Sequence, residues 1–396
     1  MRRVWKTLPV VLLLLYTGAN LVRLGGGDPE TPHHDFVAYH AAARAVIEGE
    51  DPYEPASPPG DPSTTRQYRY PPLTIWFFVP FGLFPYATAW RLFLGVKIAF
   101  ALAVVLVWWF RFDGRKHPAV FLALALLAFN AAILKDLKAG NVTMIEQLPL
   151  WLGLAGFLAA RYRTFAVLVA VSALFKLTNA FFLVLCLTLP RPARVRTALT
   201  GAGILGASLL LSGIVYPDHF RSFLHHAWGA IGEIRGAVSP SSVNLLHDFR
   251  EGLASRLSVS LPTWTSWAAW AAFSATIVVL SLRGSRRLSR EPGRDARLDL
   301  VLLACLVFVL ISPRTKDYTC VLLVPAAFHI VTEYRRLPAR WLLLLLLVLS
   351  ARYVLPMALG FVYDLLWQYV ALFGALLLWV LFLHEKREVP AAPNSA

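Results

Sequence analysis

Long apolar runs recur along the whole chain and are separated by short clusters of Lys and Arg. Segments such as 301–311, 342–349 and 370–383 contain no charged residue, so as helices they would have no polar face to present to water. Helices of this kind are stable inside a bilayer, whose hydrocarbon core is spanned by about 20 apolar residues. The runs therefore predict a polytopic membrane protein.

The composition agrees with this class, since 57% of the residues are hydrophobic and only 15% are charged. Soluble domains have about 25% charged residues. The formal net charge is +15 at pH 7, a value that also occurs in nucleic-acid-binding proteins. Here, however, the basic residues punctuate the apolar runs and do not form one face with stacking aromatics, which argues against nucleic acid as a partner. Placed in cytoplasmic loops, they satisfy the positive-inside rule.

With the basic clusters inside, the pattern predicts an all-α transmembrane bundle of about 11–12 helices. The regular spans are expected at 8–24, 90–110, 119–134, 142–160, 198–215, 263–282, 298–311, 318–332, 341–356 and 363–383. Two stretches are less regular. Prolines interrupt 72–84, which predicts a half-inserted or interfacial helix. Basic clusters at both ends of 164–189 predict two short passes that turn near Lys176, although the number of crossings at 71–110 and at 164–189 stays open.

We expect a single integral membrane domain, 1–385, followed by a disordered cytoplasmic tail, 386–396. The basic N-terminus precedes an apolar run without a small-residue cleavage site, so this run is expected to stay as an uncleaved span. Both termini would then be cytoplasmic. The expected extracytoplasmic loops are two large ones, 25–70 and 216–262, and two short ones, 135–141 and 312–317.

No pattern in the sequence suggests a metal or another cofactor. The adjacent histidine pairs of the outer loops cannot point at one ligand from a helix, and neither a His-Glu-x-x-His nor a Cys-x-x-Cys motif occurs. The cysteines have no disulfide or zinc spacing. They all lie in apolar segments, at Cys186, Cys305 and Cys320.

The first large loop carries an Asp at the start of a predicted helix, 36–48. Two interpretations of Asp35 are open. As an N-cap, its carboxylate would accept hydrogen bonds from the free N–H groups of the first turn. As a general base, it would be kept ionised at the membrane surface by the helix N-terminus. Residue type and position alone favour the cap.

Several cations are expected at the outer ends of helices, namely Arg69, Lys135, Lys138, Lys176, Arg314 and Lys316. Lys176 is the most informative because it interrupts an apolar run, and a charge at membrane depth is costly unless it is paired or meets water. Snorkelling to the outer interface is the simpler interpretation of Lys176, as a solvated turn is for Arg314 and Lys316. Together, these cations would suit an anionic headgroup such as a phosphate.

The outer loops also contain a series of short motifs. The first loop has Asp35-Phe36-x-x-Tyr39, Gly49-x-Asp51-Pro52-Tyr53 and Tyr68-Arg69-Tyr70-Pro71-Pro72. Later segments have Lys138-Ala139-Gly140-Asn141, Lys176-Leu177-Thr178, Asn244-Leu245-Leu246 and Ser312-Pro313-Arg314. This series resembles glycosyltransferase family 87, polyprenol-phosphate-mannose-type enzymes of the C superfamily. The family usually carries a Pro near Asn179 and often a His in the late loop, so the cation that binds the donor phosphate stays open.

The resemblance implies a glycosyltransferase that moves a sugar, mannose in the typical case, from a polyprenyl phosphate to a lipid or glycan acceptor. It implies an extracytoplasmic site in a plasma membrane, inversion at the anomeric carbon, and Asp35 as general base. Because phosphate is a good leaving group, cations can replace the second carboxylate that glycoside hydrolysis requires. The substrate contacts implied are His34, Tyr39, Arg69, Tyr70, Lys138, Asn141, Lys176, Asn244, Arg314 and Lys316.

Two other functions stay open at this level. A transporter or flippase of a lipid-linked or anionic substrate would explain the interrupted helices and Lys176. Such a protein usually has ionisable residues near the bilayer midplane, whereas Asp and Glu are nearly absent from the expected spans, with Glu146 as the main exception. A non-catalytic scaffold would fit the departures in the late loop.

Overall fold

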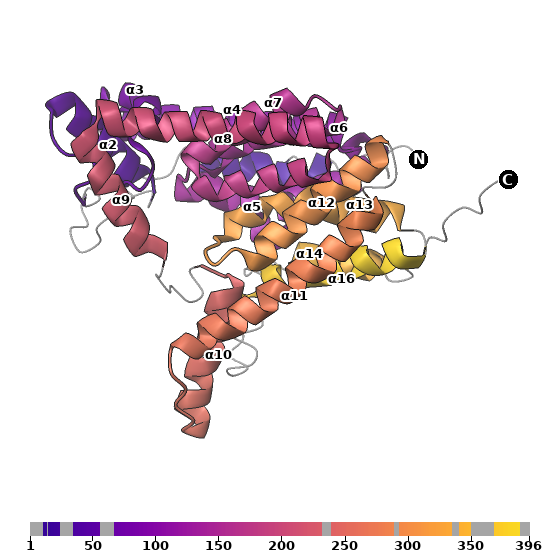
Figure 1. Cartoon of the computed structure of the whole chain (residues 1–396). Helices are drawn as coiled ribbons and strands as arrows, with labels where there is room; N and C mark the ends of the chain where they lie inside the picture. The colour runs from indigo at the N-terminus through magenta and orange to yellow at the C-terminus, as the bar shows by residue number, and fades with distance from the viewer. Residues whose placement is uncertain are drawn as a thin grey trace. The chain divides into compact units, whose positions relative to one another are not determined.

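A computed structural model describes residues 11–13, 15–23, 35–55, 67–231, 239–288, 293–334, 340–349 and 368–388. Every regular element in these ranges is an α-helix or a 3-10 helix, which confirms the all-α fold (Figure 1). By its contacts the chain divides into two compact units. The first comprises residues 1–113 and 133–233, and the second comprises 114–132 and 234–396. The single membrane domain expected from the sequence stays a prediction.

Four of the described helices are long and apolar enough to cross a membrane. They are α4 (Tyr86–Arg111), α5 (Pro118–Ala139), α8 (Arg191–Val215) and α11 (Trp264–Leu288). Each lies at an expected span, so the chain is a polytopic membrane protein. The other expected spans coincide with shorter or more charged helices, which are α6 (Thr143–Leu158), α7 (Tyr162–Phe175), η3 (Leu177–Thr188), α12 (Arg294–Ile311), α13 (Val324–Glu333), α14 (Arg340–Leu349) and α16 (Val370–Glu388).

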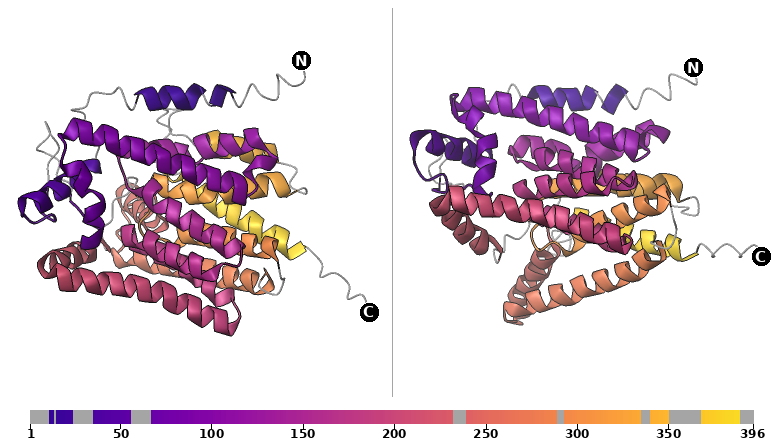
Figure 2. Two further views of the ribbon diagram at one scale, coloured as in Figure 1. Left: turned by 90° about the horizontal axis from the view of Figure 1, so that it is seen from above. Right: turned by 45° about the horizontal axis from the view of Figure 1, so that its top comes forward.

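In the first unit, α4, α6, α7 and α8 pack side by side (Figure 2). Glycine allows helices α6 and α7 to approach closely, because a Cβ on Gly153 of α6 would lie 3.3 Å from the Phe165 carbonyl oxygen of α7. Small residues serve the same purpose wherever helices meet in membranes. The helical conformation is interrupted at Lys176, whose backbone is extended (φ −152°, ψ 98°) between α7 and η3. This break is where the sequence predicts a turn.

The first loop of this unit is largely helical in its described part. It contains α2 (Phe36–Glu48), which ends at Gly49 in the left-handed conformation (φ 78°). The proline-rich stretch that follows forms two short helices, η1 (Pro72–Phe77) and α3 (Val79–Gly82). A Cβ on Gly82 would come within 2.9 Å of the Ala43 Cβ. This close contact packs α3 tightly against α2.

In the second unit, the buried helix α12 packs against α11, α16 and η5 (Asp317–Leu323). The expected large loop 216–262 contributes α9 (Pro217–Ile231) to the first unit and α10 (Ser242–Leu257) to the second. Helix α16 continues through Glu388, into the first residues of the expected tail. Residues 389–396 lie outside the described part, as do 350–356 and 363–367 of the last two expected spans.

One expected loop is wrong. Residues 135–139 were expected in an outer loop, but α5 continues through Ala139. The irregular backbone lies earlier, at 128–131, where three successive residues have positive φ angles. Polar side chains between Lys135 and Ala139 are typical of a loop. They are compatible with a buried helix here because Asp136 forms an ion pair with Lys97.

Candidate active site

Asp35 stands at the N-terminus of α2 without capping it. Its backbone is helical (φ −92°, ψ −31°) and its side chain accepts no hydrogen bond from the first turn, whereas N-caps normally have extended backbones. Instead, the Asp35 N–H donates to the Ala139 carbonyl oxygen at 3.0 Å, which ties the start of α2 to the end of α5. The partly exposed carboxylate is therefore not consumed by helix capping.

Asn141 holds the Asp35 carboxylate. Its side-chain Nδ2 donates to Asp35 Oδ2 at 2.8 Å and lies 3.3 Å from the Tyr39 hydroxyl. Its Oδ1 accepts the backbone N–H of Thr143 at 3.0 Å and the Thr143 hydroxyl at 2.7 Å. Because both donors occupy Oδ1, the amide can turn only its NH₂ group toward Asp35. The amide of Asn141 therefore fixes the orientation of the Asp35 side chain.

Aromatic residues of the first loop extend this contact chain. The Tyr39 hydroxyl lies 3.0 Å from the Tyr70 hydroxyl, and the Tyr53 hydroxyl donates to the Tyr70 carbonyl oxygen at 2.6 Å. Burial raises the pKa of both Tyr53 and Tyr68 above the ordinary phenol value. The phenols thus stay neutral and can act as hydrogen-bond donors.

Four of the residues implied by the resemblance are thus brought together, in the order Asp35, Asn141, Tyr39 and Tyr70. Arg69 is partly exposed in the same loop, and Lys138 is exposed in the last turn of α5. His34 lies outside the described residues.

Gly140 makes the approach between α5 and α2 possible. Its φ is +67°, a conformation that L side chains rarely adopt. A Cβ at this position would lie 2.9 Å from the Phe36 Cβ and 3.1 Å from the Trp90 ring. Backbone conformation and close packing therefore both require glycine next to Asn141.

A buried ion pair that the sequence analysis missed lies beneath Asp35. Lys97 of α4 and Asp136 of α5 are both fully buried, with Lys97 Nζ 3.0 Å from Asp136 Oδ2. Lys97 Nζ also donates to the Asp136 backbone oxygen at 2.5 Å. The available signal was a lysine inside the apolar run 90–110, since an ionisable residue within a membrane span usually has a functional role.

Lys176 is paired too. Its Nζ lies 3.4 Å from Oε1 of Glu146, which is fully buried, while a quarter of the Lys176 side chain is exposed. Asn179, near the position where the family usually has Pro, donates its side-chain N–H to the Ser172 hydroxyl at 2.8 Å. Ser172 in turn donates to the Glu146 carbonyl oxygen at 2.8 Å. Lys176 is therefore fixed by a partner and does not depend on snorkelling alone.

The remaining predicted residues lie in the second unit, where serines hold a turn. Three hydroxyls near the start of α10 donate to backbone carbonyl oxygens before or within the segment 312–316. These bonds join Ser239 to Thr315 at 2.6 Å, Ser241 to Pro313 at 2.8 Å and Ser242 to Leu310 at 2.7 Å. We call these three residues the serine clamp. The held segment presents Arg314 and Lys316, both partly exposed.

Asn244 supports the serine clamp from inside. It is 1% exposed, and its side-chain N–H groups donate to the Ser239 carbonyl oxygen at 2.6 Å and the Ser241 hydroxyl at 3.0 Å. A residue this buried shapes the turn, and its contact with a substrate stays a prediction.

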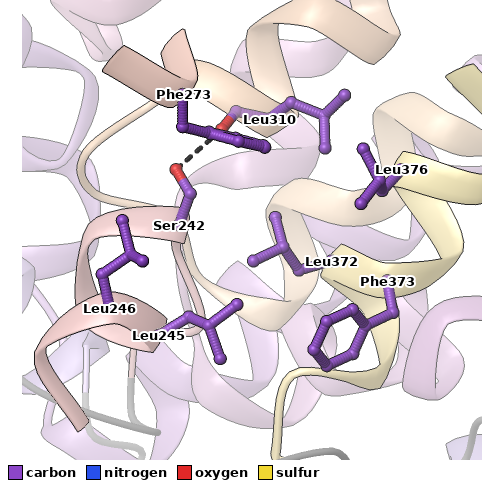
Figure 3. Close-up of a pocket in the computed structure, with 8 residues that line it drawn as sticks. All are labelled: Ser242, Leu245, Leu246, Phe273, Leu310, Leu372, Phe373 and Leu376. Atoms are coloured by element: carbon purple, nitrogen blue, oxygen red, sulfur yellow. Dashed lines mark hydrogen bonds between the residues drawn. The ribbon is translucent and has the colours of Figure 1, made fainter. Parts of the chain in front are cut away.

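A small apolar groove adjoins the clamp in the second unit (Figure 3). Its lining comes from α10, α11, α12 and α16 and consists of Ser242, Leu245, Leu246, Phe273, Leu310, Leu372, Phe373 and Leu376. The Ser242 hydroxyl donates to the Leu310 carbonyl oxygen, so the surface of the groove consists mainly of Leu and Phe side chains. Such a groove suits an apolar chain.

Among the described residues, no group of three or more His, Cys, Asp or Glu side chains could hold a metal ion. The independence from metals stays a prediction.

The sequence model of Glycosyltransferase family 87 matches residues 68–313, more than half of the chain. The matched range contains Asn141, Lys176 and Asn244, whereas Asp35 precedes it and Arg314 follows it directly. No curated protein matches the chain significantly. The helical membrane architecture and the outer-loop motifs agree with the family match, and the chain belongs to glycosyltransferase family 87.

Proposed function

We propose that this membrane glycosyltransferase transfers a hexose from a polyprenyl-phosphate donor to a glycolipid or glycan acceptor, with Asp35 as general base. The observation that best supports the proposal is the 2.8 Å hydrogen bond from Asn141 to the Asp35 carboxylate. It orients the partly exposed side chain of Asp35, and a general base must be held within reach of the proton that it takes.

The proposed reaction is a single displacement. The acceptor hydroxyl gives its proton to the Asp35 carboxylate while its oxygen bonds to the anomeric carbon of the donor sugar. The bond between that carbon and the phosphate oxygen breaks, and the polyprenyl phosphate leaves with the bonding electrons. One displacement inverts the anomeric carbon, and cations stabilise the charge that develops on the phosphate.

The donor phosphate needs exposed positive charge. Lys176 in the first unit, and Arg314 and Lys316 in the second, are partly exposed and are our candidates for this contact. Lys97 is not a candidate, because its side chain is fully buried. The apolar groove supports a lipid-linked donor, since its uncharged walls suit a hydrocarbon chain better than a nucleotide.

The sugar and the membrane side are also proposals. Mannose is proposed from the family resemblance, and the extracytoplasmic side of the plasma membrane from the positive-inside rule, with both termini cytoplasmic. Buried ion pairs within membrane helices also occur in transporters. The family match favours transfer over transport.

The test is transfer of radiolabelled mannose from polyprenyl-phosphate mannose in membranes. At equal protein level, Asp35→Asn is expected to lose transfer by about 10²–10⁴-fold, the usual contribution of a general base. Asp218→Asn is the matched control, because the Asp218 side chain is 88% exposed in an i,i+3 surface pair with Arg221. Equal transfer by the wild type and Asp35→Asn contradicts the proposal, and flux of unmodified substrate across vesicles supports the transporter.

A further inference from the structure

The buried pair Lys97–Asp136 has no role in the proposed reaction so far. Both side chains are fully buried, so neither contacts a substrate. Buried ion pairs add little to stability on average, because desolvation of the two charges offsets their attraction, and apolar replacements are often neutral or stabilising. The presence of this pair at the start of the segment 136–141, whose Ala139 and Asn141 contact Asp35, therefore requires its own explanation.

One structural connection runs along the last turn of α5. Lys97 Nζ contacts both the carboxylate and the backbone oxygen of Asp136, which fixes the helix at that residue. Three residues later the Ala139 carbonyl oxygen accepts the Asp35 N–H, and Asn141 then holds the Asp35 side chain. The two atoms that fix Asp35 thus belong to the segment that Lys97 anchors.

A second connection runs through aromatic rings. Lys97 Nζ lies 5.9 Å from the centroid of the Phe93 ring. Phe93 stacks on Phe36 with ring centroids 4.7 Å apart and an interplanar angle of 20°. Phe36 is the residue that follows Asp35 and lies against Gly140. Lys97 is therefore connected to Asp35 in two ways. One connection runs along the end of α5 to the Asp35 backbone, and the other runs through Phe93 to the Phe36 ring.

We propose that Lys97 and Asp136 are positioning residues, which hold the Asp35 carboxylate in the geometry required for transfer. This inference rests on the proposed function in so far as Asp35 is the base. The physical reason is that a reacting group displaced by about 1 Å can lose about 10²-fold in rate. A charged pair buried between two helices fixes their register more sharply than apolar contacts, which tolerate sliding.

The test compares the double variant Lys97→Met/Asp136→Leu with the wild type, since a single replacement would leave a buried charge and risk unfolding. Steady-state transfer is expected to show kcat lowered about tenfold or more, with the donor KM within about twofold. The double replacement Arg44→Met/Glu48→Leu is the control, because it removes an exposed i,i+4 pair on α2 itself. It should leave both constants unchanged.

Hydrogen exchange separates this inference from the proposed function. In the Lys97→Met/Asp136→Leu variant, the Asp35 amide that bonds to Ala139 should exchange faster, while amides of α12 keep their rates. Faster exchange with lowered kcat supports the positioning role. Faster exchange together with full transfer by Asp35→Asn would refute Asp35 as base but keep the structural connection. Wild-type exchange and wild-type kcat in the double variant would overturn the inference.

Discussion

The Asp35 corner of the first unit (Asp35, Tyr39 and Asn141) and the clamped turn of the second (residues 312–316) are held in different ways. At the corner, Asn141 donates to the Asp35 carboxylate, and the ion pair between Lys97 of α4 and Asp136 of α5 fixes the helix end that precedes Asn141. At the turn, the serine hydroxyls donate to backbone carbonyl oxygens and leave Arg314 and Lys316 partly exposed. The first arrangement fixes a side chain, and the second fixes a backbone path.

This difference has a functional meaning. A reacting group must be held to within fractions of an ångström, because the rate falls steeply with misplacement. Long cationic side chains that neutralise an anion can adjust to it, so only their starting points need to be fixed. Substitutions at the corner are therefore expected to lower kcat, and those at the turn to raise the donor KM.

Among the substitutions that test this difference between the two regions, Gly140→Ala is expected to have the largest effect. The alanine would have to adopt a φ of +67°, and its Cβ would lie 2.9 Å from the Phe36 Cβ. We therefore expect the end of α5 to move away from Asp35. A displacement of about 1 Å would lower transfer by about 10²-fold. Transfer by purified protein measures this. Gly203→Ala in α8 is the control, because nothing lies within 4 Å of its Cβ position. Wild-type transfer by Gly140→Ala would contradict the claim that transfer requires Asp35 to be held tightly.

A smaller but more specific effect is expected at Asn141. Asn141→Ala removes the donor to Asp35 and should lower kcat by about tenfold, the value of a hydrogen bond to a charged group. Asn141→Asp places a second carboxylate beside Asp35, where like charges disfavour ionisation of both. The acid limb of the pH–transfer profile should then move to higher pH. An unshifted profile for Asn141→Asp would argue that Asp35 does not titrate in the reaction.

The clamped turn provides the contrasting test. Asn244→Ala removes two hydrogen bonds that support the serine clamp. We expect the donor KM to rise about three- to tenfold, since the loss of one or two weak contacts amounts to about 1 kcal/mol, with kcat within about twofold. Ser255→Ala, on the same helix, removes a local bond to Gly252 and is the control. A fall in kcat with an unchanged donor KM would contradict the assignment of donor binding to the clamped turn.

The smallest effect concerns acid stability of α2. His40 bonds through Nε2 to the Phe84 carbonyl oxygen, and burial lowers its pKa below the usual 6.5. The unfolded chain therefore binds a proton more readily than the folded one, so the stability that His40 contributes is complete above about pH 6.5 and is lost as the pH falls through the lower folded pKa. On acidification, protection from hydrogen exchange, measured relative to the intrinsic exchange rate at each pH, should fall in α2 before it falls in α12. His40→Gln should remove this difference, and an unchanged pH dependence would exclude His40 as its source.

Part of this account was predictable from the sequence. The apolar runs and their basic boundaries predicted the long helices and the break at Lys176, because hydropathy and charge act locally. The motif resemblance pointed to Asp35, Tyr39, Tyr70 and Asn141. The hydrogen bond between Asp35 and Asn141 joins residues 106 positions apart, and no local pattern specifies such a pairing.

The features that the sequence did not reveal have a common physical cause. Residues 135–139 were expected in a loop, yet they are helical and the charge of Asp136 is compensated by Lys97 from another segment. Asn244 stays a predicted substrate contact, and its burial among the serines that it supports could not be predicted. Burial and pairing depend on tertiary contacts, which residue type alone does not reveal.

The central claim is that Asp35 acts in the chemical step and not in donor binding. The most direct measurement determines donor affinity and the single-turnover transfer rate in the same purified Asp35→Asn protein, with polyprenyl-phosphate mannose as the probe. We predict a donor Kd within about twofold of the wild type and a transfer rate lowered by about 10²-fold or more. An unchanged transfer rate, or a loss of rate explained entirely by weaker donor binding, would contradict the claim.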